Sequence, residues 1–167
     1  MIQVGDTAPA FDLPGTDGDE VERYRLSDFT ESGAAVVLFY PFDFSPVCTE
    51  ELCNFRDSEM LTFTADLDVV AISADSVYAH RKFVRENDLP IPLLSDHDGR
   101  VSEAYGVLYD ELEGHPTVSK RAVFVVDSEE AVRYAWVADE WTTDPDITAV
   151  YECVRDLECI EIPSGPF

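Results

Sequence analysis

A serine and two cysteines lie close together at a point where a strand is predicted to give way to a helix. Cys48 follows Ser45 by three residues, and Cys53 follows Cys48 by five. A helix N-terminus favours negative charge, because its first N–H groups are unpaired and its dipole is positive there. The anion that a cysteine supplies is its thiolate, which is also the nucleophilic form. The pattern therefore predicts a reactive thiol at Cys48, rather than the buried structural thiol that an isolated cysteine usually is.

The elements that must position this thiol are visible in the flanking sequence. Residues 35–40 form an apolar run that is rich in β-branched and aromatic side chains, which predicts a buried strand, and Pro41 ends it. Ser45 suits the N-cap of a following helix, and Pro46 suits its first position. We expect this helix over about residues 47–60, with the nucleophile in its first turn.

Strands and helices alternate through the rest of the chain, and the last two strands form a hairpin. This order predicts an α/β sandwich with a mixed β-sheet, and the length favours a single domain over residues 1–167. The N-terminal part is expected to be an extended arm at residues 2–13, turns at Gly15 and Asp17–Gly18, a short strand within residues 20–26 and a helical turn at residues 27–29. Later strands are expected at residues 68–73, near 89–94, at 122–126 and at 131–137. Helices are expected from Asp75 or Ser76 to about Asn87 and at residues 100–105. A last helix is expected with Asp144 as its cap and Pro145 as its first residue.

Composition excludes several classes of function. The chain has 167 residues, with 35 acidic against 11 basic side chains and a net charge of −24, so it repels phosphate backbones and is not expected to bind nucleic acid. The acidic residues are spread along the chain, which is typical of a protein from a high-salt cytoplasm. No apolar run approaches the roughly 20 residues of a membrane helix. Residues 1–6 lack the features of a secretory signal, so we expect a cytoplasmic protein whose four cysteines are thiols.

The motif Pro41-x-x-x-Ser45-x-x-Cys48 resembles the Pro-x-x-x-Thr/Ser-x-x-Cys signature of the peroxiredoxins. The longer segment 39–57 resembles the bacterioferritin-comigratory-protein and one-Cys alkyl hydroperoxide reductase branches of that family. Segments 4–13, 94–99, 104–107 and 121–127 resemble the family in the same order, so that the similarity covers residues 2–157. The resemblance implies a thioredoxin fold with an N-terminal extension. It also implies a thiol peroxidase that reduces H2O2 and organic hydroperoxides without a metal or an organic cofactor.

Peroxide cleavage requires a stabilised thiolate and donors for the oxygen that leaves. The resemblance implies that Cys48 is the peroxidatic thiol and that Arg121 activates it, since a guanidinium keeps its charge and can contact sulfur and oxygen together. Ser45 takes the donor position, where it departs from the commoner Thr but keeps the hydroxyl. Pro41 is expected to shield the sulfur from water, and Glu51 to support the arginine.

The oxidised thiol must be reset by a second thiol. Resemblance to the bacterioferritin-comigratory branch implies that Cys53 resolves the Cys48 sulfenate. Five residues along an α-helix separate Cα atoms by about 8.6 Å, whereas a disulfide wants roughly 4.4–6.8 Å, so the helix must unwind first. Cys159 and an external thiol remain alternatives to Cys53 as the resolving thiol. Otherwise, Cys153 and Cys159 are expected to be partly buried and to have no redox role. A thioredoxin-like protein or a small thiol is the expected reductant, and the family contains both monomers and homodimers.

Two other classes of function remain open from the sequence. One is a thiol–disulfide oxidoreductase on the same fold, although the chain lacks the Cys-x-x-Cys motif of such enzymes. The other is a non-enzymatic redox sensor that uses the same cysteine. His80, His97 and His115 are scattered without metal-ligand spacing, so we expect no metal site and place all three on the surface.

Overall fold

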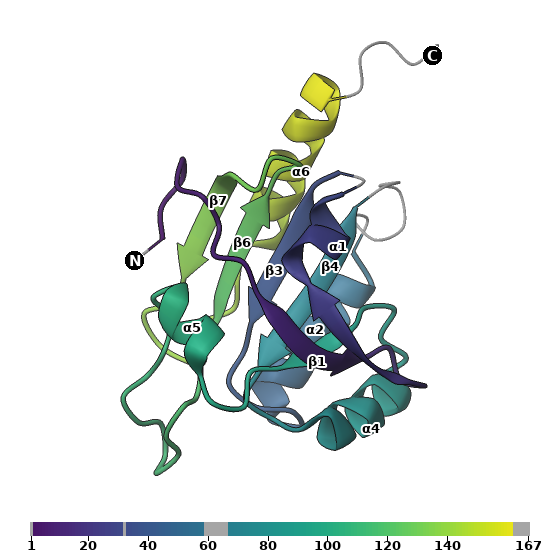
Figure 1. Ribbon diagram of the computed structural model, residues 1–167. Helices are drawn as coiled ribbons and strands as arrows, with labels where there is room; N and C mark the ends of the chain where they lie inside the picture. Colours follow the sequence, from purple (N-terminus) through teal and green to yellow (C-terminus); the bar gives the residue numbers. More distant parts are fainter. Residues whose placement is uncertain (1, 32, 59–66, 162–167) are drawn as a thin grey trace.

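The computed structural model describes residues 2–31, 33–58 and 67–161, and it describes side chains as far as Leu157. Within these residues seven strands form one sheet in the order β2-β1-β5-β4-β3-β6-β7 (Figure 1). Strands β3, β4 and β5 are parallel, and the other pairings are antiparallel, which confirms the predicted mixed sheet. The strands are β1 (Asp12–Thr16), β2 (Val21–Arg25), β3 (Ala35–Phe39), β4 (Asp68–Ser73), β5 (Leu93–Ser95), β6 (Ala122–Val126) and β7 (Val132–Val137).

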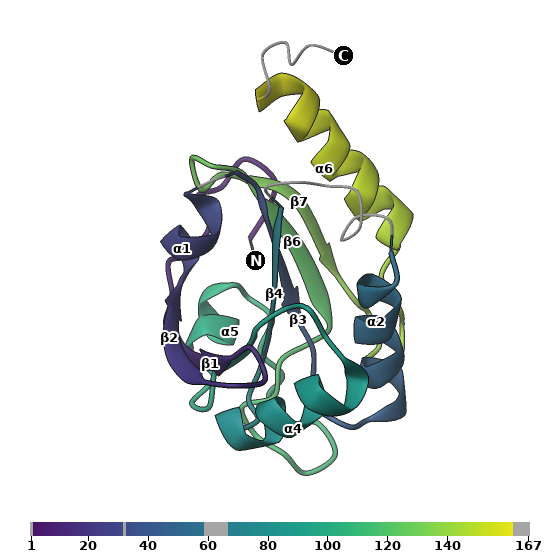
Figure 2. The same ribbon diagram turned by 90° about the vertical axis from the view of Figure 1, so that its right-hand side faces the viewer.

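Helices cover both faces of this sheet (Figure 2). Side chains of α2, α4 and α6 belong to one buried cluster, and those around α1 and α5 belong to a second cluster on the opposite face. No helix of the described ranges is long and apolar enough to cross a membrane. The helices are α1 (Leu26–Thr30), α2 (Pro46–Arg56), α4 (Val77–Asn87), α5 (Arg100–Ala104) and α6 (Ile147–Glu161).

Strand β3 lies between the two clusters. Val36 and Leu38 point into the cluster beneath α2, whereas Val37 and Phe39 point into the other one, as the alternation of strand side chains requires. All four are fully buried. Burial on both faces explains why this strand is a continuous apolar run instead of an alternating one.

Helix α2 begins as its sequence predicts. Ser45 has extended backbone angles, and its hydroxyl oxygen accepts a hydrogen bond from the backbone N–H of Cys48 at 3.3 Å, with Pro46 at the first helical position. The helix ends at Arg56, so the predicted end near residue 60 is wrong for residues 57 and 58. Residues 59 and 60 lie outside the described part of the chain.

The N-terminal hairpin differs from expectation at one glycine. Asp17 and Gly18 form the turn between β1 and β2 as predicted, but Gly15 lies inside β1 rather than in a turn. A Cβ atom on Gly15 would lie 2.9 Å from the carbonyl oxygen of Leu93 and 2.9 Å from the ring of Tyr24. Glycine is therefore required here by close packing of neighbouring strands and not by a turn.

The start of the last helix also differs from the prediction. Helix α6 begins at Ile147, and the carboxylate of Asp146 accepts from the N–H of Ala149 at 3.1 Å, so Asp146 is the capping residue rather than Asp144. Pro145 precedes the helix instead of opening it. Val150, Val154 and Leu157 form the buried face of this helix.

Candidate active site

Cys48 lies in the first turn of α2, just beyond the carboxyl end of β3. Its side chain is fully buried within the cluster between α2 and the sheet. Its backbone N–H is held by Ser45, and its sulfur faces the guanidinium of Arg121, whose Nη2 donates to Sγ at 3.1 Å. The sulfur therefore lies in a buried position, at a helix start and in contact with a permanent cation.

The sheet register brings Arg121 to this thiol from a distant part of the chain. Strand β6 runs antiparallel to β3, and Ala122 pairs with Phe39 at the end of β3. Arg121 comes directly before Ala122, so it lies beside the point where the chain leaves β3 for the loop to Cys48. The predicted contact between these two residues, 73 positions apart, is thereby found.

The guanidinium of Arg121 is fully buried and is held at three points. Besides Cys48, it donates from Nη1 to Oε2 of Glu51 and from Nε to the carbonyl oxygen of Trp141 at 3.0 Å. Burial alone would lower the pKa of Arg121, but Glu51 and Cys48 more than offset it and raise that pKa. The planar fork is thus fixed in direction, with one arm aimed at the sulfur.

Glu51 is the acidic partner in this site. It lies three residues after Cys48 on the same face of α2 and is 1% exposed. Burial raises the pKa of Glu51 to about 7, because the lost hydration outweighs the attraction of Arg121, and the charge of Asp144 raises it further. Its Oε1 has no hydrogen-bond partner among the described residues.

Ser45 and Pro41 lie on the loop side of the thiol. Ser45 is half-buried, and because its oxygen accepts from Cys48, its hydroxyl proton is available to another acceptor. Pro41 is buried and lines a shallow hollow together with Phe42 and Val118. The structure therefore brings Ser45 and Arg121 into contact with Cys48, and Glu51 into contact with Arg121. Pro41 lines a hollow to which none of these four residues contributes.

Cys53 lies on the same intact helix as Cys48, and both are free thiols. Cys53 is half-buried and its Sγ is 3.7 Å from Oδ1 of Asn87 in α4. Cys153 is half-buried beside the carbonyl oxygen of Arg133, and burial raises the pKa of its thiol. The side chain of Cys159 lies outside the described residues.

Two features of the site region were not predicted from the sequence. The carbonyl of Trp141 is a backbone group, and no residue type marks it. His80 was expected on the surface but is fully buried, whereas His97 and His115 are exposed as predicted. The available signal was the position of His80 three residues before the buried Phe83, which places both on one helix face.

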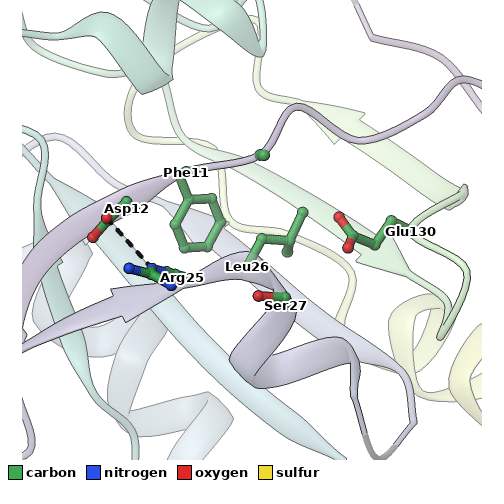
Figure 3. Close-up of a pocket in the computed structure, with 7 residues that line it drawn as sticks. Phe11, Asp12, Arg25, Leu26, Ser27 and Glu130 are labelled. Atoms are coloured by element: carbon green, nitrogen blue, oxygen red, sulfur yellow. Dashed lines mark ion pairs between the residues drawn. The ribbon is translucent and has the colours of Figure 1, made fainter.

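A separate hollow lies beside the start of α1 (Figure 3). Helix α1 is on the opposite face of the sheet from α2 (Figure 2). Phe11 and Leu26 line it, and both belong to the second buried cluster. Asp12 and Arg25 form an ion pair at its rim, with 3.5 Å between Oδ2 and Nε. None of the predicted site residues lines this hollow, so it is not part of the thiol site.

The family model described as the AhpC/TSA family matches residues 4–135. A Coxiella burnetii protein provisionally named peroxiredoxin bcp is 41% identical over 138 residues, which cover 81% of this chain and 88% of that protein. The Bacillus subtilis peroxiredoxin Bcp is 35% identical over 138 residues, which cover 81% of this chain and 85% of that protein.

The crystal structure of the peroxidoxin BcpB from Mycobacterium tuberculosis superposes on this chain with a TM-score of 0.80 at 31% identity. The superposition covers 94% of this chain and 99% of that one, and it confirms the thioredoxin-like fold. The chain belongs to the AhpC/TSA family and is a thiol-dependent peroxidase of the peroxiredoxin type.

Proposed function

We propose that Cys48 is the peroxidatic thiol and that it reduces H2O2 and organic hydroperoxides. Its thiolate attacks one peroxide oxygen, the S–O bond forms as the O–O bond breaks, and the second oxygen leaves as hydroxide or alkoxide and takes up a proton. Sulfur loses two electrons and becomes a sulfenic acid, while the peroxide becomes water or an alcohol. The thiol and its neighbours suffice for these steps without a metal or an organic cofactor.

The observation that carries this proposal is the buried contact between Arg121 and the sulfur of Cys48, at 3.1 Å. The cation stabilises the thiolate before attack and the leaving oxygen during attack, because an electrostatic contact is strongest where water is excluded. Glu51 keeps the guanidinium in that direction. The hydroxyl of Ser45 donates to the bound peroxide, and Pro41 keeps water away from the sulfur.

The Cys48 sulfenate is reset by Cys53 in the same chain. The thiolate of Cys53 attacks the oxidised sulfur, an S–S bond forms as the S–O bond breaks, and the hydroxide that leaves takes up a proton to become water. Both cysteines lie on intact α2, so at least the first turns of the helix must unwind before the bond forms. Local opening of a helix end costs little compared with global unfolding.

A thioredoxin-like protein or a small dithiol then returns both sulfurs to thiols. The cytoplasm keeps such reductants available, and it is the compartment we propose. The enzyme acts as a monomer or as a homodimer, and its acidic surface disfavours nucleic acid as a partner.

The assay that tests this function is peroxide consumption by wild type, Cys48→Ser and Cys153→Ser in the presence of a dithiol. We expect Cys48→Ser to lose activity and Cys153→Ser, the matched control, to keep it. Activity in Cys48→Ser would contradict the proposal. Insulin reduction without peroxide would identify a disulfide reductase instead, and a wild-type rate equal to that of free cysteine would identify a sensor.

A further inference from the structure

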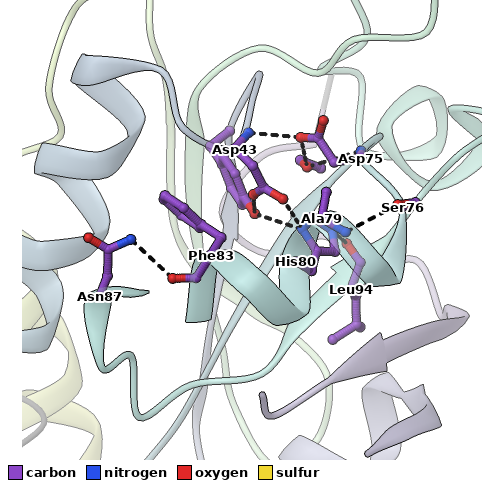
Figure 4. Close-up of polar contacts among 10 residues, drawn as sticks. Asp43, Asp75, Ser76, Ala79, His80, Phe83, Asn87 and Leu94 are labelled. Carbon is purple, nitrogen blue, oxygen red and sulfur yellow. Dashed lines mark hydrogen bonds and ion pairs between the residues drawn. The ribbon is translucent and has the colours of Figure 1, made fainter. Parts of the chain in front are cut away.

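His80 is a buried residue of α4, and its side chain contacts the loop that leads into α2. The Nδ1 of His80 is 2.7 Å from Oδ2 of Asp43, and its Nε2 is 3.0 Å from the carbonyl oxygen of Leu94 (Figure 4). The hydroxyl of Tyr40 donates to the other oxygen of Asp43 at 2.6 Å. His80 and Tyr40 are fully buried, and Asp43 is nearly so. The network joins the end of β3, the loop and α4.

This geometry requires a proton between His80 and Asp43. The carbonyl oxygen of Leu94 can only accept, so Nε2 carries a hydrogen. Nδ1 and Oδ2 cannot approach to 2.7 Å through two lone pairs, so a second hydrogen lies between them. Oδ1 of Asp43 accepts a further hydrogen bond, from the hydroxyl of Tyr40. The histidine and the aspartate therefore share a hydrogen in a buried network.

The other groups that face this histidine are acidic. Asp75, on the connection between β4 and α4, accepts from the backbone N–H of Asp43 and from the hydroxyl of Ser73, each at 2.8 Å. Burial raises the pKa of Asp75, and the charge of Asp43 raises it further. Burial, followed by Asp43, also raises the pKa of Tyr40. Strand β5 contributes a backbone carbonyl. The side chain of His80 thus lies beside two buried or half-buried acidic residues, Asp43 and Asp75.

Asp43 is connected to the thiol through a strained residue. Phe44, which follows it, has a φ of +66°, a left-handed conformation that costs energy for any residue with a side chain. Its ring packs edge-on against Phe83 of α4, with the centroids 5.0 Å apart. The next residue, Ser45, caps α2 and holds the N–H of Cys48. Strain of this kind persists only where the surroundings over-determine the backbone.

We propose that His80 is a positioning residue for peroxide reduction, acting through the proton that it shares with Asp43. That bond fixes the loop on α4, keeps Phe44 left-handed and so holds Cys48 opposite its arginine. The inference rests on the proposed role of Cys48 but is separable from it, because Cys48→Ser tests the chemistry and variants of His80 test the positioning.

Two amide variants separate the contacts of the histidine. In His80→Asn the amide N–H takes the place of Nδ1 and can still donate to Asp43, whereas in His80→Gln it takes the place of Nε2. We expect His80→Gln to lower the second-order rate constant for H2O2 about tenfold, since a charge-assisted hydrogen bond to the loop is lost. His80→Asn should recover most of that rate.

His97→Asn, at an exposed histidine, is the matched control and should keep the wild-type rate. A folded His80→Gln protein with the wild-type rate would overturn the proposal. If His80→Gln does not fold, His80→Asn decides: a rate about tenfold below that of the wild type overturns the proposal, and a rate close to the wild type supports it. In the reduced wild type, NMR should show one proton on Nε2 of His80 and a second, hydrogen-bonded proton between Nδ1 and Asp43, and absence of the second proton would contradict the assignment.

Discussion

Arg121 donates a hydrogen bond from Nη2 to the sulfur of Cys48 across 3.1 Å, and both side chains are fully buried. The guanidinium is held from behind by Glu51 and by the carbonyl of Trp141, so its direction does not depend on the thiol itself. The cation is thus arranged before the peroxide arrives, which is the condition under which electrostatic stabilisation is most effective.

Replacing Arg121 by Gln should slow peroxide reduction by more than about tenfold, because a neutral amide stabilises neither the thiolate nor the departing oxygen. The rate constant is measured by rapid mixing of reduced protein with H2O2. Arg133→Gln is the matched control, since Arg133 is a partly exposed arginine paired with Asp127. A near wild-type rate in Arg121→Gln would rule out the assigned role.

Glu51 should leave a signature in the pH dependence of stability. Its pKa is raised from 4.5 to about 7 in the folded state, so its contribution is fully present below pH 4.5 and is lost as pH rises through 7. The free energy of unfolding of wild type minus that of Glu51→Gln should therefore fall by on the order of 3 kcal/mol over this window. Denaturant titrations of both proteins between pH 4 and 9 measure it. A constant difference would show that Glu51 titrates normally.

Salt should stabilise this protein. With 35 acidic and 11 basic residues, folding concentrates charges that repel one another, and salt shortens the range of that repulsion from about 10 Å at 0.1 M to about 3 Å at 1 M. Thermal melts in roughly 0.1 M and 2 M KCl, which bracket the screened regime, should differ by many degrees. Equal midpoints would contradict the expectation of a protein from a high-salt cytoplasm and would leave the enzyme assignment intact.

Oxidation should link Cys48 to Cys53. After one equivalent of H2O2 and blocking of free thiols, peptide mass spectrometry should find this disulfide. Cys53→Ser should accumulate sulfenic or sulfinic acid at Cys48, and Cys153→Ser should behave like wild type. A disulfide from Cys48 to Cys153 or Cys159, or a lasting sulfenate in the wild type, would show that Cys53 is not the resolving thiol.

Local patterns in the sequence were enough to predict the central strand, the N-cap at Ser45 and a helix that holds Cys48 in its first turn, because these depend on neighbouring residues. The pairing of Arg121 with Cys48 was predicted through resemblance, and the register of β6 on β3 accounts for it. Gly15 and His80 were misplaced because their surroundings come from distant strands. The choice between two aspartates as the cap of α6 depends on the bend of the preceding loop, which residue type does not fix.

The central claim is that Cys48 is the sulfur that peroxide oxidises. The most direct measurement treats reduced Cys53→Ser protein with one equivalent of H2O2 in the presence of a sulfenic-acid trapping reagent and locates the adduct by peptide mass spectrometry. We predict one adduct, on Cys48, and none when Cys48 is also replaced by Ser. An adduct mainly on Cys153 or Cys159 would contradict the account.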